Sequence, residues 1–317
     1  MRQRSLLSFL KTNNNSKHND LEVYDLFCGA GGFSAGARDA GCRVVFACDN
    51  NEDALRTHAL NHPDTSHVCC ELPCEIPLPV DGRPFHVHGS PPCQKLSQAN
   101  QTQRLVGDNE AAINLVDWYL KFALASGATS WSMEQVANKQ IIDIVERLRL
   151  KNLSMVSYGV FSFDKLGVPQ TRKRLIAGSP CLIAKLICEA QNQPRRSIKD
   201  VILHPRGTHV RGRIATFRHD FKRIVDDDGN ERRKYKKAKW SDYCRPIKGA
   251  APTVLARHAL LWITADGEGK NRSALNSLEL AALQTFPPTY IFPKAKGLAC
   301  SQIGNAVPPR VAELMLR

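Results

Sequence analysis

The sequence predicts an α/β fold in which a mostly parallel sheet carries helices on both faces and a smaller lobe is inserted. Short apolar segments with strand character alternate with helical segments from Leu21 onward, and this alternation is typical of parallel sheets. A basic stretch, residues 195–248, breaks the alternation, and the apolar periodicity resumes after Pro252. A length of 317 residues, 43% of them hydrophobic, suffices for a large domain with a second lobe and excludes a wholly disordered chain.

The first predicted unit is a strand, a glycine-rich turn, a helix and a second strand. Leu21–Phe27 is the first strand, Phe33–Ala40 begins the helix, and Arg43–Cys48 is a strand that ends at Asp49. Glycines let a ligand approach the backbone closely, and an acidic residue about 20 positions further on can accept hydrogen bonds from ribose hydroxyls. This unit therefore predicts a nucleotide-type pocket, although its glycines do not have the strict dinucleotide-binding spacing. The three glycines are Gly29, Gly31 and Gly32.

The same patterns predict four further strands and three further helices. The strands are Phe85–His88, Ser130–Met133, Met155–Phe161 and Arg174–Ala177, and the helices are Ala111–Leu124, Ile141–Leu150 and Ser277–Phe286. We expect four segments along the chain: a flexible basic tail at 1–20, a catalytic domain at 21–180, an inserted recognition lobe at 181–250, and a return segment at 251–317 that completes the catalytic domain.

The positive charge of the chain is concentrated in one place. The formal net charge is +14, and +10 of it falls in residues 195–248, which hold 17 Lys and Arg against 7 Asp and Glu. A local excess of this kind suits a polyanion, above all nucleic acid. A solvated basic surface, or a nuclear-targeting run at Arg232–Lys239, stays open as an alternative.

Composition also indicates the cellular compartment in which the protein works. No apolar run approaches the roughly 18–20 residues that cross a bilayer, and Met1–Asn19 lacks the apolar region of a secretory signal. An odd number of cysteines, 11, favours free thiols in a reducing compartment. Cys69, Cys70 and Cys74 lack a second half with matching spacing, so we expect no metal site. We expect an intracellular monomer without a membrane partner, nuclear in a eukaryote and otherwise in the cytoplasm or nucleoid.

Residues that can carry chemistry follow the predicted strands. Cys93 comes after Phe85–His88, Glu134 directly follows Ser130–Met133, and two arginines, Arg172 and Arg174, come after Met155–Phe161. Ligands of open parallel sheets bind outside the carboxyl ends of the strands. We therefore expect a thiol, a carboxylate, two guanidiniums and the nucleotide-type pocket to share one edge of the sheet.

Six segments of the chain occur in an order typical of one enzyme family. They are Asp25–Ser34, Pro91–Gln94 with Ser97, Glu134–Val136, Gly167–Arg174, Leu280–Pro287 and Gln302–Pro309. Through them the sequence resembles the DNA (cytosine-5) methyltransferases from Leu21 to Arg317. The resemblance implies a Rossmann-like class I methyltransferase sheet, S-adenosyl-L-methionine as the cofactor, and a target recognition domain in the basic insert.

The resemblance also implies DNA (cytosine-5-)-methyltransferase activity on a cytosine in double-stranded DNA. Cytosine C5 becomes nucleophilic when a thiolate adds to C6, and Cys93 is the predicted nucleophile. Glu134 would hydrogen-bond ring N3 and the exocyclic amine, which requires a pKa raised by burial next to the base. Arg172 and Arg174 would hold the O2 and phosphate edges. For these arginines, a surface pair on a basic protein is the alternative.

By the same resemblance, several segments form the cofactor pocket. Phe27 contacts the adenine, Asp49 accepts hydrogen bonds from the ribose hydroxyls, and Glu71 accepts one from the adenine amine. The glycines of the first turn line the methionine part. The other expected cofactor-binding residues are Gly29, Gly31, Gly32, Asn50, Pro92, Asn305 and Val307.

DNA is expected to meet both the catalytic loop and the basic insert. A base inside a duplex cannot reach this constellation, so the cytosine must be flipped out at a cost of about a few kcal/mol. The insert would supply phosphate contacts and major-groove readout. The expected DNA-contacting residues are Gln94, Ser97, Arg206, Arg211, Arg213 and Arg218.

Three residues depart from the family pattern. Gln135 replaces the usual Asn, and its extra methylene is expected to affect the position of Glu134. Asn50 stands where a larger apolar residue commonly packs on the adenine, and Glu71 is one methylene longer than the usual Asp. None of these changes removes an atom that the chemistry demands, so we expect an active enzyme.

Two other functions stay open. A tRNA cytosine-5 methyltransferase would use the same catalytic set, but that branch carries a Cys-Phe-Thr tripeptide, and Cys244 is followed here by Arg245-Pro246. A catalytically weak DNA-binding relative would be favoured by a missing Cys or Glu, and both are present. The tail segment Gln3–Leu10 resembles a sliding-clamp-binding peptide, although we favour a short disordered amphipathic tail.

Overall fold

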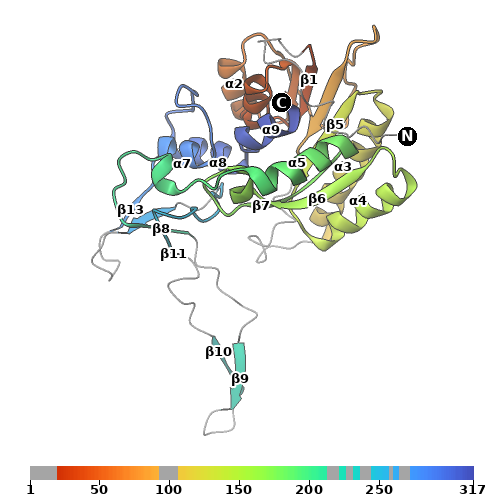
Figure 1. The fold of residues 1–317 in the computed structure, drawn as a ribbon. Helices are drawn as coiled ribbons and strands as arrows, with labels where there is room; N and C mark the ends of the chain where they lie inside the picture. The colour runs from red at the N-terminus through yellow and green to blue at the C-terminus, as the bar shows by residue number, and fades with distance from the viewer. Residues whose placement is uncertain are drawn as a thin grey trace, which may run out of the picture.

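A seven-stranded sheet with helices on both faces dominates the computed structural model of the chain (Figure 1). The strand order is β3-β2-β1-β4-β5-β7-β6, and all neighbouring strands are parallel except that β7 runs antiparallel to both β5 and β6. The predicted α/β fold with a mostly parallel sheet is confirmed. The residues that the structure describes are 20–92, 106–212, 221–225, 231–235, 244–256, 260–263 and 272–317.

The predicted strands lie within about two residues of the observed ones. The sheet strands are β1 (Glu22–Leu26), β2 (Arg43–Asp49), β3 (Ser66–Cys69), β4 (Phe85–Gly89), β5 (Ser130–Gln135), β6 (Ser157–Ser162) and β7 (Lys173–Gly178). The helices are α1 (Gly32–Asp39), α2 (Glu52–Asn61), α3 (Val106–Ala125), α4 (Lys139–Lys151), α5 (Pro180–Asn192), α7 (Ser277–Leu283), α8 (Lys296–Asn305) and α9 (Pro309–Leu316). In the described part of the chain, no helix is long and apolar enough to cross a membrane.

The two faces of the sheet carry separate hydrophobic cores. In β1, Tyr24 and Leu26 belong to the core with α3 and α4, whereas Val23 packs in the core with α1, α5 and α9. In β2, Phe46 joins the first core and Val44 the second. Because successive side chains of a strand point to opposite faces, strands covered on both sides must be apolar at nearly every position. Apolar residues accordingly fill most of β2, whereas β4 and β5 also carry buried polar residues such as His86, His88 and Ser132.

A smaller four-stranded antiparallel sheet packs beside the large one. Its order is β11-β8-β12-β13, with bounds Cys244–Pro246, His209–Arg211, Leu261–Ile263 and Arg272–Ala274. Val210 and Trp262 of this sheet share a core with Leu280 of α7 and Ile303 of α8.

The division into units therefore differs from the expected boundaries at 180 and 250. The smaller sheet takes β8 and β11 from before residue 250 and β12 and β13 from after it. In contrast, α5 follows residue 180 but buries Leu182 and Leu186 in the core of the large sheet. Packing of apolar faces sets these units, and the basic stretch at 195–248 begins only after α5 has ended.

A two-stranded antiparallel ribbon, β9 (Phe221–Val225) with β10 (Glu231–Tyr235), lies between β8 and β11 in the chain. Figure 1 shows it projecting away from the two sheets. Residues 226–230, between its two strands, lie outside the described residues, as does the Gln3–Leu10 segment.

Four buried histidines make the fold sensitive to acid. Burial lowers the pKa of His58 and His88, and it lowers the pKa of His62 to about 4 and that of His86 to about 3. The unfolded chain binds protons at these residues near pH 6.5, whereas the folded chain does not, so stability is lost as the pH falls below that value. Asp25 acts in the opposite direction, because burial raises its pKa to about 7 and its contribution to stability is lost as the pH rises from about 4 to 7.

We expect the free energy of unfolding to fall when the pH is lowered from 6.5 to 5. Each histidine contributes up to ~1.4 kcal/mol per pH unit, and the four histidines outweigh the opposing carboxyls of Asp25, Asp39 and Asp49, whose pKa values burial raises. Urea denaturation at a series of pH values measures the effect. An Asp25→Asn control should show a steeper fall, since one opposing carboxyl is gone. A flat profile over this range would contradict the prediction.

Candidate active site at the carboxyl edge of the sheet

The glycine-rich turn after β1 is held tightly against the return segment. Phe27 has a φ of 56° and Gly31 one of 89°, both in the left-handed region. A Cβ on Gly31 would lie 2.5 Å from Tyr290 Oη, and one on Gly32 would lie 2.2 Å from the Val307 carbonyl oxygen. Only glycine fits these two positions. The structure thus brings Val307 to the turn, where the sequence placed it.

Asp49 joins this turn to the end of β2. Its carboxylate accepts hydrogen bonds from the backbone N–H groups of Gly29 and Asn51, each at 2.8 Å. Its own carbonyl oxygen accepts from Cys70 N at 3.1 Å, which ties the segment after β3 to the same place. Burial raises the pKa of Asp49, and these backbone donors oppose the rise. Asp49 therefore positions the turn and the segment that carries Glu71.

The remaining predicted cofactor residues lie at the ends of neighbouring elements. Asn50 follows β2, Glu71 follows β3, Pro92 follows β4, and Asn305 ends α8. All four are exposed, and Phe27 is half-buried. Side chains at this edge are thus available to a ligand, and Gly29 has open space beside it, whereas Gly31 and Gly32 are packed against protein.

The loop that carries the predicted nucleophile begins at this edge. Ser90 N donates to the Leu26 carbonyl oxygen at 3.2 Å, and the buried Gln135 donates from Nε2 to the Pro91 carbonyl oxygen at 3.0 Å. Gln135 is the residue that departs from the family's usual Asn, and its amide fixes the start of the loop. Cys93, Gln94 and Ser97 lie outside the described residues.

Glu134 lies buried between two arginines, with only 5% of its surface exposed. Its Oε1 is 3.1 Å from Arg174 Nε and 3.9 Å from Arg172 Nη2. Antiparallel pairing of β5 with β7 sets Glu134 opposite Ile176, which brings Arg174, two residues earlier, to the carboxylate. The sequence placed this carboxylate with these guanidiniums, and the structure joins them. Neither arginine is a surface residue, so the surface-pair alternative is wrong.

Arg172 and Gln170 bind the main chain of the return segment. Arg172 Nη1 donates to the carbonyl oxygens of Gly304, at 3.0 Å, and Val254, at 3.3 Å. Gln170 Nε2 donates to the Leu283 carbonyl oxygen at 3.0 Å, while its Oε1 accepts from Val254 N at 3.0 Å. This geometry makes Arg172 a residue that holds the return segment beside Glu134, in addition to any contact with substrate.

An Arg172→Met substitution is therefore expected to destabilise the fold by about 3–5 kcal/mol, because it leaves buried acceptors unpaired. The unfolding midpoint in urea measures the loss. Arg56→Met is the matched control: Arg56 is exposed and its ion pairs with Glu52 and Asp53 lie on the surface, so its effect should stay below ~1 kcal/mol. Equal midpoints for the two variants would contradict the assignment.

Sequence reasoning missed a buried chain of serines and histidines that leads to the catalytic loop. It runs along β4 and β5, with hydrogen bonds of 2.7, 2.8, 2.8 and 2.9 Å between successive members. Both histidines are fully buried, and the Phe33 ring stacks on one of them with centroids 3.5 Å apart. Polar residues at every second position of two adjacent strands were the available signal. The members in order are Ser130, His86, Ser132, His88 and Ser90.

The candidate DNA-contacting arginines are placed in part. Arg206 forms a bidentate ion pair with Glu279, with N–O distances of 2.6 and 3.1 Å, and it also donates to the Ala274 carbonyl oxygen. Arg211 lies in β8 of the smaller sheet, and Arg213 and Arg218 lie outside the described residues. In this structure, therefore, the Arg206 guanidinium secures the smaller sheet to α7.

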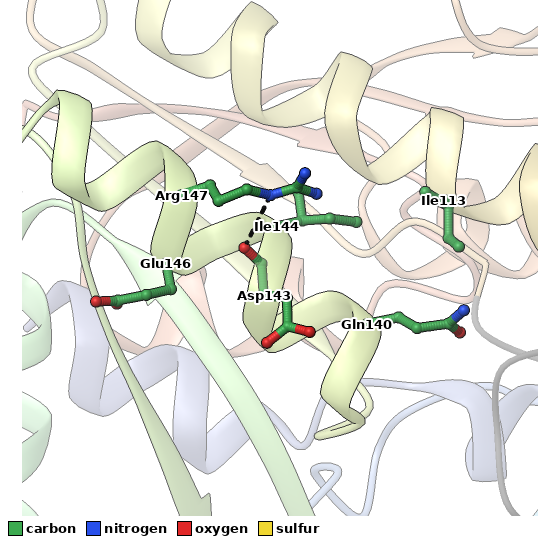
Figure 2. Close-up of a pocket in the computed structure, with 6 residues that line it drawn as sticks. All are labelled: Ile113, Gln140, Asp143, Ile144, Glu146 and Arg147. Atoms are coloured by element: carbon green, nitrogen blue, oxygen red, sulfur yellow. Dashed lines mark hydrogen bonds between the residues drawn. The ribbon is translucent and has the colours of Figure 1, made fainter.

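A cavity of ≈ 590 Å³ lies between α3 and α4 (Figure 2). Ile113 lines it from α3 and five residues line it from α4, where Arg147 Nε donates to the Asp143 carbonyl oxygen at 3.2 Å. None of these residues belongs to the predicted site, and the cavity presents both acidic and basic groups. We therefore place the chemistry at the carboxyl edge of the sheet and not in this cavity.

Comparison with known proteins finds a matching family model, related sequences and a solved structure with a similar fold. A family model described as C-5 cytosine-specific DNA methylase matches residues 21–317. Type II methyltransferase M1.HphI of Haemophilus parahaemolyticus is 26% identical over 92% of this chain and 85% of its own length, and M.HgiDI of Herpetosiphon aurantiacus is 26% identical over 92% of both chains. A solved structure, described as a DNA modification methyltransferase encoded within an E. coli prophage, matches with a TM-score of 0.61 at 18% identity, covering 93% of this chain and 97% of that one.

Proposed function

This chain belongs to the C-5 cytosine-specific DNA methylase family, and we propose that it methylates C5 of a flipped-out cytosine in double-stranded DNA through a covalent adduct with Cys93. S-adenosyl-L-methionine is the methyl donor of this family. The observation that carries the proposal is the hydrogen bond from Gln135 to the Pro91 carbonyl oxygen. Because Gln135 follows Glu134 and Pro91 precedes Cys93 by two residues, this bond supports a loop that starts at the strand end that carries the carboxylate.

The proposed reaction uses the Cys93 thiol and the Glu134 carboxylate together. Cys93 Sγ adds to C6 while Glu134 interacts with ring N3, and the electron pair of the C5–C6 double bond makes C5 nucleophilic. Arg174, beside Glu134, offers donors to the O2 edge as negative charge develops on the ring. After C5 has taken the methyl group, the C5 proton leaves to an ordered water and the Cys93–C6 bond breaks.

The residues at the sheet edge fit the methyl donor. The donor supplies a methyl group on a positively charged sulfur. Asp49 and Glu71 offer carboxylate oxygens for ribose hydroxyls and an adenine amine, and Phe27 offers a half-buried ring for the adenine. Gly29 supports a close approach of the ligand to the backbone, because a Cβ there would meet no atom within 4 Å.

The β9–β10 ribbon supports duplex DNA as the substrate. Its register sets Lys222 opposite Lys234 and Arg223 opposite Arg233. A two-stranded ribbon whose paired positions carry basic residues suits a polyanion, and the major groove of DNA admits two strands.

One experiment tests the substrate and its context together. Bisulfite-type sequencing of DNA from cells that express the protein should show new 5-methylcytosine in a defined sequence context. Labelled cofactor offered with duplex DNA and tRNA side by side decides between the two nucleic acids. Transfer to tRNA alone would overturn the DNA proposal, and cofactor binding without transfer to either would favour the catalytically weak relative.

A further inference from the structure

Two cysteines that the proposed chemistry does not use lie next to the cofactor edge. Cys70 follows β3 directly, and Cys74 comes four residues later. Their Sγ atoms are 3.1 Å apart, with the Cys74 thiol donating to Cys70. A disulfide bond is ~2.05 Å long, so the sulfurs need to approach by only about 1 Å to bond. Both side chains are half-buried, which leaves them within reach of a small oxidant.

The segment between them carries Glu71, the carboxylate expected to accept a hydrogen bond from the adenine amine. The Cys70 N–H donates to the Asp49 carbonyl oxygen at 3.1 Å, which fixes one end of the segment to β2. Leu72 is buried in the core under α3 and α4, whereas Glu71 is exposed. A bond between the two sulfurs would therefore close a short ring with Glu71 inside it.

The surroundings favour a disulfide over other chemistry of the pair. The described residues contain no group of three or more His, Cys, Asp or Glu side chains that could hold a metal ion. A third thiol, Cys48, interacts with Cys70 but is buried, and burial raises its pKa. Burial also raises the pKa of Cys74 to about 11, so this thiol keeps its proton at neutral pH and Cys70 is the sulfur that attacks first.

We propose that Cys70 and Cys74 form an oxidation site whose disulfide weakens cofactor binding, the effect on the cofactor resting on the proposed function. The oxidant is a low-molecular-weight disulfide. Cys70 Sγ attacks one of its sulfurs and releases one thiol, and Cys74 Sγ then displaces the second thiol from Cys70. Two protein thiols become one disulfide, the oxidant is reduced to two thiols, and the two protons pass to them.

The expected effect on the cofactor follows from the size of the movement. Binding groups must be held within about 0.5 Å of their working positions, and forming the bond brings the two sulfurs about 1 Å closer. Because Glu71 lies between the two cysteines, we expect the closed ring to displace its carboxylate. We expect the dissociation constant for S-adenosyl-L-methionine to rise about tenfold on oxidation and to return on reduction.

The test uses the full chain treated with glutathione disulfide at pH 8.5. Peptide mapping without reduction should find a Cys70–Cys74 cross-link in the wild type and in the exposed-neighbour control Cys69→Ser. The Cys74→Ser variant should lack the cross-link and carry glutathione on Cys70 instead. Equilibrium dialysis then measures cofactor binding in wild type before oxidation, after oxidation and after reduction, because methyl transfer would also report on Cys93.

The possible outcomes separate the two proposals. Glutathione on the wild-type cysteines without a cross-link between them, or a cross-link from Cys70 to Cys48, overturns the oxidation site. An unchanged dissociation constant in cross-linked protein overturns the effect on the cofactor. Reduced protein that binds no cofactor overturns the proposed function, while the peptide map still decides whether the oxidation site exists.

Discussion

Replacing Cys93 with alanine is expected to abolish methyl transfer, with a fall in rate of at least ~10⁴-fold. Without addition of the thiolate at C6, C5 of cytosine has too little electron density to attack the methyl group. The measurement is transfer of labelled methyl groups to duplex DNA. A second readout is independent of turnover: wild-type protein should form a covalent adduct with DNA that contains 5-fluorocytosine, since fluorine at C5 cannot leave as a proton does.

A matched control separates this role from the general loss of a thiol. Cys181 is exposed at the start of α5, and Cys181→Ala should keep both the transfer rate and the adduct. Cys93→Ala should still bind S-adenosyl-L-methionine, because the residues assigned to the cofactor are unchanged. Retained methyl transfer in Cys93→Ala, or the absence of an adduct with wild-type protein, would falsify the covalent mechanism.

A Glu134→Gln substitution is expected to lower kcat by about 10²–10³-fold, within the usual range for a group that assists proton transfer in the transition state. Glutamine has nearly the same size and can donate a hydrogen bond to N3, but it cannot transfer a proton to N3 as a carboxyl group can. It also leaves two guanidiniums without their carboxylate, since Glu134 Oε1 lies 3.1 Å from Arg174 and 3.9 Å from Arg172. We therefore expect a lower unfolding midpoint in the same variant.

The control for Glu134 is a glutamate-to-glutamine change in helix α4, which covers one face of the sheet. Glu146 in α4 pairs with Arg149 at 2.7 Å, and Glu146→Gln should leave kcat within about twofold of the wild type, because this pair is partly exposed and far along the chain from the loop. Cofactor affinity should be unchanged in both variants. A kcat for Glu134→Gln close to that of Glu146→Gln would contradict the role assigned to Glu134.

The predicted fold was confirmed where burial leaves a mark on the sequence. β1 and β2 are covered on both faces, so apolar residues fill most of both strands, apart from the buried Glu22 and Asp25 in β1 and the charged ends of β2. β3 was missed because its residues, Ser66–Cys69, form a largely exposed edge strand that needs no apolar face. α5 lies beyond the expected boundary at 180, whereas its buried Leu182 and Leu186 pack in the core of the large sheet.

The sequence likewise predicted some residues of the site and missed some of its contacts. Motif order placed Asp49, Glu134 and Arg174 at one edge because the carboxyl ends of parallel strands meet there. The serine–histidine chain of β4 and β5 was not found, since hydrogen bonds between adjacent strands depend on register. The approach of Cys74 to Cys70 was not found either. The spacing of the cysteines argued against a zinc site, but it did not show that the two sulfurs are in contact.

The sequence by itself determined the family, the sheet and the identity of the chemical groups, because these depend on residue types and on their order along the chain. Only the tertiary structure decided what each group contacts. Arg172 is a buried link to the return segment, and Arg206 is paired with Glu279. The physical reason is that these contacts join residues 73–132 positions apart, and such pairings arise from packing of whole elements, which no local pattern encodes.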